Sequence, residues 1–103
     1  MYLVEIFLPL SDNSGKPLER KLFSVVRNEL AARFGGLTVY SRAPATGLWH
    51  EDNEGRTAED DIVIYEVMAR HLDRSWWADY RKILESRFQQ NEVLIRVSTI
   101  EQI

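Results

Sequence analysis

The feature that most constrains the fold of this chain is a strand–helix–strand unit that occurs twice. An apolar segment over residues 2–10 leads into a helical segment that ends at Phe34, and an extended segment follows over residues 37–42. The same order recurs about sixty residues later, with an apolar segment over 62–69, a helical segment that ends at Phe88 and an extended segment over 92–98. Two βαβ units in tandem predict an α+β fold, although a fold alone does not identify a reaction.

The two units predict a specific sheet topology. A βαβ crossover is right-handed, and its two parallel strands leave room for another strand between them. Interleaving two such units gives a ferredoxin-like βαββαβ fold, with a four-stranded antiparallel sheet in the order 4-1-3-2 and two helices on one face. Segments 2–10 and 62–69 are almost entirely apolar, which favours the two central positions for them. An alternative is an α+β sandwich in which the 43–60 segment adds an extra edge strand.

The first predicted helix has one apolar stripe and clear end signals. Pro17 is expected at its first position, because the fixed φ of proline suits that place. Gly35 is expected to end it in the left-handed conformation. The stripe repeats every four residues, with Phe23 beside it, and consists of Leu18, Leu22, Val26, Leu30 and Phe34.

The second predicted helix follows the same logic. Asp73 is expected to cap its N-terminus. Its apolar stripe consists of Trp77, Tyr80, Leu84 and Phe88, and we expect Ile83 to lie beside this stripe. Trp76 falls near the border of the stripe, so core packing is favoured over a stacking platform for the Trp76-Trp77 pair.

Length and composition limit the class of protein. A chain of 103 residues predicts one domain over 1–103, and the absence of cysteine excludes a disulfide framework and a thiolate nucleophile. The net charge of −3 and the pI near 5.4 argue against nucleic acid as a partner. The first apolar segment is interrupted by Glu5 and lacks a basic flank, so it is a poor signal peptide and too short to span a membrane. We expect a soluble cytoplasmic protein with no membrane partner.

Strand alternation assigns candidate functional residues to one face of the sheet. Because a carboxylate avoids a helix-packed core, Glu5 marks the open face, and Glu66 takes the same face on the neighbouring strand. In the order 4-1-3-2, Arg96, Glu5, Glu66 and either Tyr40 or Arg42 form a row across the sheet. The favoured interpretation is a ladder of compensating charges. The alternative is an acid/base pair, in which desolvation of Glu5 and Glu66 would raise the pKa of one of them.

The same face carries a large apolar surface. Its residues are Leu3, Phe7, Ile62, Ile64, Met68 and Leu94, which is more than a monomer usually leaves exposed to water. The commonest cover for such a surface is a second copy related by a twofold axis. We therefore predict a homodimer that pairs sheet against sheet, with Trp49 from the 43–60 segment at the interface or on a pocket wall.

The duplicated pattern, the size and the expected sheet pairing resemble the dimeric α+β barrel superfamily. This superfamily includes small monooxygenases, muconolactone-isomerase-like enzymes and haem-degrading proteins, and the resemblance covers nearly the whole chain. The segments Phe34-Gly35-Gly36-Leu37-Thr38 and Gly47-Leu48-Trp49 are similar to those of small uncharacterised bacterial proteins of this type. The resemblance implies a small-molecule pocket between sheet and helices, lined by Tyr40, Trp49, Glu66 and Arg96.

No catalytic motif identifies a reaction, and no cofactor is indicated. His50, Glu51 and Asp52 with Asp60 and Asp61 resemble a set of metal ligands, but so acidic a segment is more typical of a solvated loop, and we predict no metal site. A homodimeric binding or interaction module is the first hypothesis for function. An enzyme or ligand carrier of the dimeric-barrel type is the alternative. An RNA-recognition domain comes last, because Glu5 and Glu66 on the open face would repel phosphates.

Overall fold

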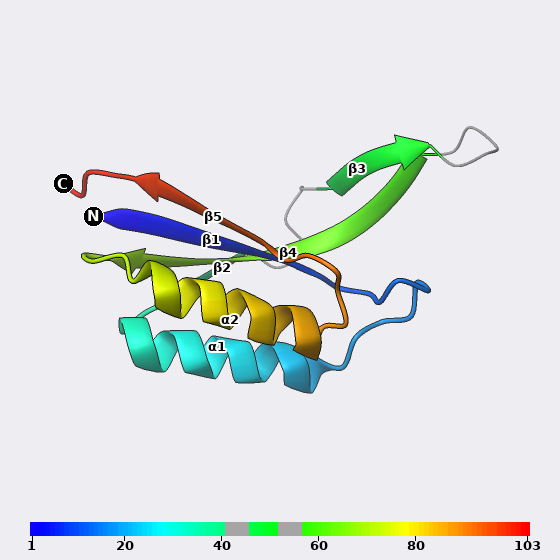
Figure 1. Cartoon of the computed structure of the whole chain (residues 1–103), viewed down its shortest axis with the longest axis horizontal. Coiled ribbons are helices and arrows are strands. Elements are labelled where there is room, and N and C mark those ends of the chain that lie inside the picture. Colours follow the sequence, from blue (N-terminus) through cyan, green and yellow to red (C-terminus); the bar gives the residue numbers. More distant parts are fainter. Residues whose placement is uncertain (41–45, 52–56) are drawn as a thin grey trace.

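The computed structural model describes residues 1–40, 46–51 and 57–103, and for residues 46–51 and 57–61 this description covers the backbone. These residues form two helices and five strands in the order β1 (Tyr2–Pro9), α1 (Arg20–Phe34), β2 (Thr38–Tyr40), β3 (Thr46–Glu51), β4 (Thr57–Ala69), α2 (Arg74–Arg87) and β5 (Leu94–Thr99). Figure 1 shows α1 and α2 side by side, covering one face of the sheet and leaving the other face open.

The predicted sheet topology is confirmed. Neighbouring strands are antiparallel and lie in the order β5-β1-β4-β2. When the four strands of the ferredoxin-like fold are numbered along the chain, this order is 4-1-3-2. The extra edge strand of the alternative interpretation is also present, because β3 pairs with residues 57–61 of β4. In Figure 1 this β3–β4 hairpin projects beyond the ends of the helices.

The strand boundaries differ from the expected ones. β4 is 13 residues long and begins at Thr57, five residues before the predicted start at Ile62. The acidic sequence of its first residues, 57–61, is typical of a solvated loop, but the backbone of these residues pairs with β3. β2 is described from Thr38 to Tyr40, and the predicted continuation through Arg42 lies outside the described residues.

The core lies between the sheet and the helices, as the alternation predicts. Val4, Ile6 and Leu8 of β1 are completely buried, and Val63, Tyr65 and Val67 of β4 lie beside them. Both helices contribute their stripes to the same cluster, with Val26 and Leu30 from α1 and Trp77, Tyr80, Leu84 and Phe88 from α2. Burial of this apolar surface is the main stabilising contribution to the fold.

The start of α1 was predicted wrongly. The helix begins at Arg20, and Pro17 instead forms an isolated antiparallel bridge with Ser11. Asp12 holds this loop, because its carboxylate accepts hydrogen bonds from the backbone N–H groups of Ser14 and Lys16. Leu18 N–H also donates to the Leu10 carbonyl at 3.0 Å, so the chain is still in an extended turn at Leu18 and cannot be helical there.

The remaining helix ends follow the sequence signals. Gly35 ends α1 with φ of 72°, and its N–H donates to the Ala31 carbonyl. Asp73 caps α2 by accepting a hydrogen bond from Trp76 N–H at 3.1 Å. Ile83, which was expected beside the stripe of α2, is 43% exposed, whereas the neighbouring Leu84 is fully buried.

The two helices are joined by an aromatic cluster and by an ion pair. Phe34 of α1 stacks on Trp77 of α2 with ring centroids 5.3 Å apart. Arg87 donates two hydrogen bonds to Glu29, and the Tyr80 hydroxyl donates a third to the same carboxylate at 3.1 Å. Within the described part of the chain, neither helix has the length and apolar character that crossing a membrane requires.

Candidate functional site

The open face of the sheet gathers most of the residues that the sequence singles out. We use "open face" for the helix-free side, formed by Leu3, Glu5 and Phe7 of β1, Thr38 and Tyr40 of β2, Ile62, Ile64, Glu66 and Met68 of β4, and Leu94, Arg96 and Ser98 of β5. The register places Glu5 directly opposite both Glu66 and Arg96. The row is completed by Thr38, which lies opposite Glu66 where Tyr40 or Arg42 was expected.

Arg96 compensates the charge of Glu5. Its Nε donates to a Glu5 carboxylate oxygen at 3.2 Å, and its guanidinium lies 4.8 Å from the centroid of the Phe7 ring. The Glu5 side chain is only 20% exposed, whereas that of Arg96 is 60% exposed. The arginine therefore covers the carboxylate and leaves part of its own surface available for contact.

Tyr40 plays the corresponding part for Glu66. A hydrogen bond to the Glu66 carboxylate, and the negative charges of Glu66 and Glu5, raise the pKa of the Tyr40 hydroxyl above its ordinary value of 10.0. Tyr40 lies opposite Ile64, two residue pairs from the Thr38–Glu66 pair and on the same face, so it is a diagonal neighbour of the carboxylate. Each of the two facing carboxylates therefore has its own partner, which supports the interpretation as a charge ladder over that as an acid/base pair.

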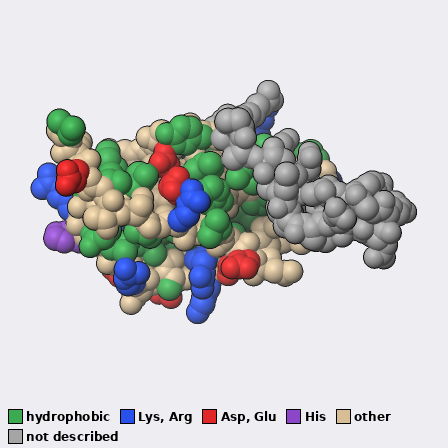
Figure 2. Space-filling view, turned by 90° about the horizontal axis from the view of Figure 1, so that it is seen from above, with side chains coloured by type: hydrophobic (Ala, Val, Ile, Leu, Met, Phe, Trp, Pro, Cys, Tyr) green, Lys and Arg blue, Asp and Glu red, His purple; other side chains and the backbone are tan. Residues whose placement is uncertain are grey.

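Apolar side chains surround this polar row. Met68 and Leu94 are each about half exposed, at 49% and 52%, and Leu3, Phe7, Ile62 and Ile64 are half-buried. Figure 2 looks onto this side of the molecule and shows hydrophobic side chains around a small group of acidic and basic ones. The described part of the open face is therefore an apolar surface with a compensated polar centre.

The pocket that the family resemblance implies, lined by Tyr40, Trp49, Glu66 and Arg96, stays a prediction. Glu66, Arg96 and Tyr40 lie on the helix-free side of the sheet, and Glu66 also lines a pocket at the sheet edge that residues of α1 share. Arg42 and the side chain of Trp49 lie outside the described residues. Among the described residues, no group of three or more histidine, aspartate or glutamate side chains is placed to hold a metal ion.

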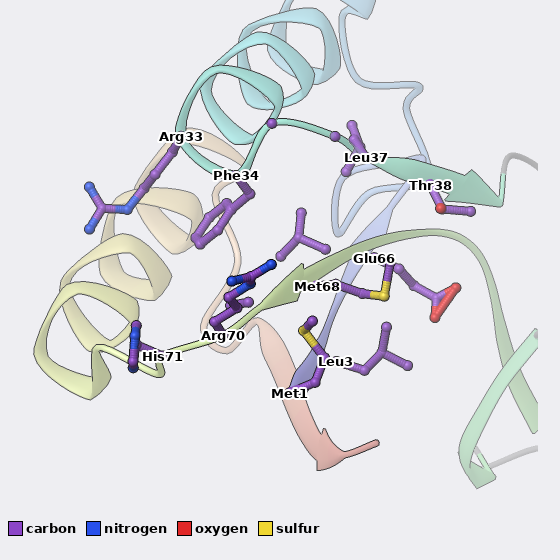
Figure 3. A pocket seen from close by; sticks show the side chains of 14 residues that line it. Met1, Leu3, Arg33, Phe34, Leu37, Thr38, Glu66, Met68, Arg70 and His71 are labelled. Carbon is purple, nitrogen blue, oxygen red and sulfur yellow. The ribbon is translucent and has the colours of Figure 1, made fainter. Parts of the chain in front are cut away.

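A pocket of about 710 Å³ opens at the edge of the sheet, and sequence reasoning missed it. We call it the edge pocket. Its lining includes Leu3, Phe34, Leu37, Glu66, Met68 and Arg70, together with Arg33 and His71 at its rim. Figure 3 shows Arg70 near the middle of these side chains, with Arg33 and His71 toward one side and Glu66, Met68 and Leu3 toward the other.

The edge pocket exists because β2 starts late. β2 pairs with β4 only from Ile64 to Glu66, while β4 continues to Ala69. Gly35 and Gly36 carry the chain from the end of α1 to β2, and they line the pocket instead of pairing with the end of β4. The Gly35-Gly36 pair was the available sequence signal, since glycines after a helix mark a chain segment that diverges from its neighbours.

Comparisons with known proteins bear on the fold. No family model matches the chain, and no curated protein matches it. Among solved structures, the chain is similar to a phage SAM lyase in complex with S-methyl-5′-thioadenosine, with a TM-score of 0.59 and 14% sequence identity. The likeness covers 94% of this chain and 79% of that one. At such low identity it shows the fold alone, and it is consistent with the ferredoxin-like α+β class found above.

Proposed function

We propose that residues 1–103 form a single ferredoxin-like domain that acts as a homodimeric binding module, pairing with a second copy through its open face. The observation that carries this proposal is the half-exposed apolar surface around Met68 and Leu94, on the side of the sheet opposite to both helices. Contiguous apolar surface of this kind marks an interaction site. A twofold-related copy presents the same surface and is the commonest partner.

The charges on the open face are compatible with burial in such an interface. Arg96 already pairs with Glu5, and Tyr40 is the diagonal neighbour of Glu66, so each carboxylate has a polar side chain beside it. Burying a charge without a partner is strongly destabilising, whereas a compensated pair can be covered at lower cost. The polar row also fixes the register between copies, because a misplaced copy would bring like charges together.

The size of the open face is of the right order for a dimer. With strands about 4.8 Å apart and about 3.4 Å per residue, the paired residues of β1, β4, β5 and β2 span roughly 400 Å² in projection. A standard interface buries about 800 Å² on each partner. The β3–β4 hairpin projects beyond the helices and extends the sheet, so it adds to the surface available for pairing (Figure 1).

The test is the mass in solution of the wild-type chain and of Ile64→Lys, measured by size exclusion with light scattering. Ile64 is half-buried on β4 at the centre of the open face, so a lysine there introduces a charge into the proposed interface. Ala32→Lys is the matched control, because Ala32 is exposed on α1. We expect dimers for wild type and Ala32→Lys, and a monomer for Ile64→Lys. A monomeric wild type, or a dimeric Ile64→Lys, would contradict the proposal.

A second candidate function is that of a small-molecule enzyme or ligand carrier of the dimeric α+β barrel type. It is supported by the structural neighbour, a phage SAM lyase in complex with S-methyl-5′-thioadenosine, and by the position of Glu66 on the edge pocket. Calorimetric titration with S-methyl-5′-thioadenosine tests it, with Glu66→Gln as the variant and Glu92→Gln, at an exposed position before β5, as the control. Saturable binding that Glu66→Gln weakens and Glu92→Gln leaves unchanged would support this candidate. If the wild-type chain does not bind S-methyl-5′-thioadenosine, the structural neighbour no longer supports this candidate.

A further inference from the structure

We propose that the edge pocket binds a small ligand that carries one anionic group, a carboxylate or a phosphate, on an apolar body. This proposal goes beyond self-association, since all the residues that carry it belong to a single chain. It also concerns a ligand class different from S-methyl-5′-thioadenosine, which has no anionic group.

The anionic group is indicated by a cluster of basic side chains. Arg70 follows the last residue of β4, His71 follows Arg70, and Arg33 lies in the last turn of α1, so two separate segments bring them to one pocket. Three arginines outside the pocket have carboxylate partners, namely Arg81, Arg87 and Arg96. Within the described part of the chain, no carboxylate lies within ion-pair distance of Arg33 or Arg70. Their guanidinium groups are the donors that match a carboxylate or phosphate best.

Arg33 is held in place for this role. Its guanidinium lies over the Trp76 ring, 4.1 Å from the ring centroid. Contact through the flat face of the guanidinium leaves the N–H groups at its edge directed outward, where an anion can accept from them. Because the side chain is already ordered by the indole, less conformational entropy is lost when the ligand binds.

The apolar body is indicated by the opposite wall. Leu3 and Met68, which are neighbours across β1 and β4, line this side together with Leu37. Met68 is 49% exposed, so a ligand can still cover much of its surface. The pocket volume of about 710 Å³ lies within the range of about 300–1,000 Å³ that is usual for small-molecule sites.

The remaining features restrict the ligand further. No described strand pairs with residues 67–69 on the β2 side, and these residues line the pocket, so a bound ligand can hydrogen-bond with this backbone edge. Glu66 lies on the far side from Arg33 and His71 (Figure 3). Its carboxylate would repel a second anionic group, so the ligand is expected to have its charge at one end only.

The test uses backbone-amide NMR titrations of the whole chain with phenyl phosphate, phenylacetate and the neutral 2-phenylethanol. Saturable shifts are expected at the amides of Gly35, Gly36 and Arg70 with at least one of the two anions. The neutral compound is expected to bind roughly tenfold more weakly or worse, because hydrogen bonds to charged groups are worth about that much or more. Comparison of the two anions shows which charged group the pocket prefers.

Two variants and one control complete the test. Arg70→Gln and Arg33→Gln each remove one guanidinium from the pocket, and both are exposed positions outside the open face, so neither change alters the proposed interface between copies. Each is expected to weaken anion binding roughly tenfold or more, whereas Arg74→Gln, outside the pocket at the start of α2, is expected to leave it unchanged. Equal affinity for the neutral compound, shifts elsewhere on the surface only, or equal losses in Arg70→Gln and Arg74→Gln would each overturn the proposal.

Discussion

The polar row on the open face makes a quantitative prediction about Arg96. Arg96→Gln removes the cation that faces Glu5, while Glu5 and Glu66 remain directly opposite each other on adjacent strands. The variant is therefore expected to be less stable than wild type. Replacing Glu66 by glutamine in the same chain is expected to restore most of the loss, because it removes the uncompensated repulsion.

The magnitude follows from distance and exposure. Side chains directly opposite each other in an antiparallel pair lie about 5 Å apart, where two unit charges interact by about 0.8 kcal/mol in water and about 3 kcal/mol at an effective dielectric constant of 20. Arg96 is 60% exposed, so the lower end of this range applies. We expect Arg96→Gln to lower the free energy of unfolding by about 1 kcal/mol, and Arg96→Gln/Glu66→Gln to lie within about 0.5 kcal/mol of wild type.

The assay is urea unfolding at pH 7 and low ionic strength, at one fixed protein concentration. Urea is preferred because a guanidinium salt would screen the charges under test. High salt is expected to reduce the difference between Arg96→Gln and wild type. The reasoning is refuted if Arg96→Gln unfolds at the same urea concentration as wild type, or if adding Glu66→Gln gives no recovery.

Three further predictions concern the helices. Leu84→Ala is expected to cost about 2–5 kcal/mol and Ile83→Ala less than about 1 kcal/mol, because only Leu84 is fully buried; similar losses in urea unfolding would contradict the helix orientation. The hydrogen bonds from Arg87 hold the pKa of Glu29 below its ordinary value of 4.5. The stability that ionised Glu29 contributes is therefore fully present above pH 4.5, and it is lost as the pH falls through the lowered pKa. Glu29→Gln is expected to cost about 1 kcal/mol at pH 7 and to flatten this acid dependence in urea unfolding; an unchanged acid dependence would count against the pair. Asp73→Ala removes the N-cap of α2 and is expected to lower the free energy of thermal unfolding by about 1 kcal/mol, whereas no change would show that the cap contributes nothing.

The open face could be predicted because strand alternation is a strict rule. Once Glu5 is assigned to the water-facing side, the period of two residues fixes the side of every other residue on that strand. The neighbouring positions of Glu5, Glu66 and Arg96 then follow from the strand order, and the register has this arrangement. Whether these residues serve pairing between copies stays a prediction that the solution measurements above decide.

Features that depend on tertiary context could not be predicted. Pro17 suits a first helical position locally, but the Asp12-centred turn and the bridge to Ser11 keep it in the loop. The position of Ile83 beside the stripe of α2 follows from helical spacing, but its 43% exposure depends on how α2 is rotated over the sheet. The acidic start of β4 has low strand propensity, and pairing with β3 overrides that preference.

The edge pocket was missed for a related reason. Its residues come from the start of β1, the end of α1 and the end of β4, and no local pattern links them. A pocket of this kind arises from the offset between β2 and β4, which is a matter of register and strand length. Sequence periodicity indicates which side of a strand is buried, but it does not indicate where a partner strand begins.

The central claim is that two copies meet through their open faces, and isotope-filtered NMR on an equal mixture of ¹³C-labelled and unlabelled chain tests it most directly. Contacts between copies are expected from the Met68 methyl group to Ile64 and Leu94, which share its face. Contacts that instead join helix residues such as Ile83, or a sample in which no contacts between copies occur, would contradict the claim.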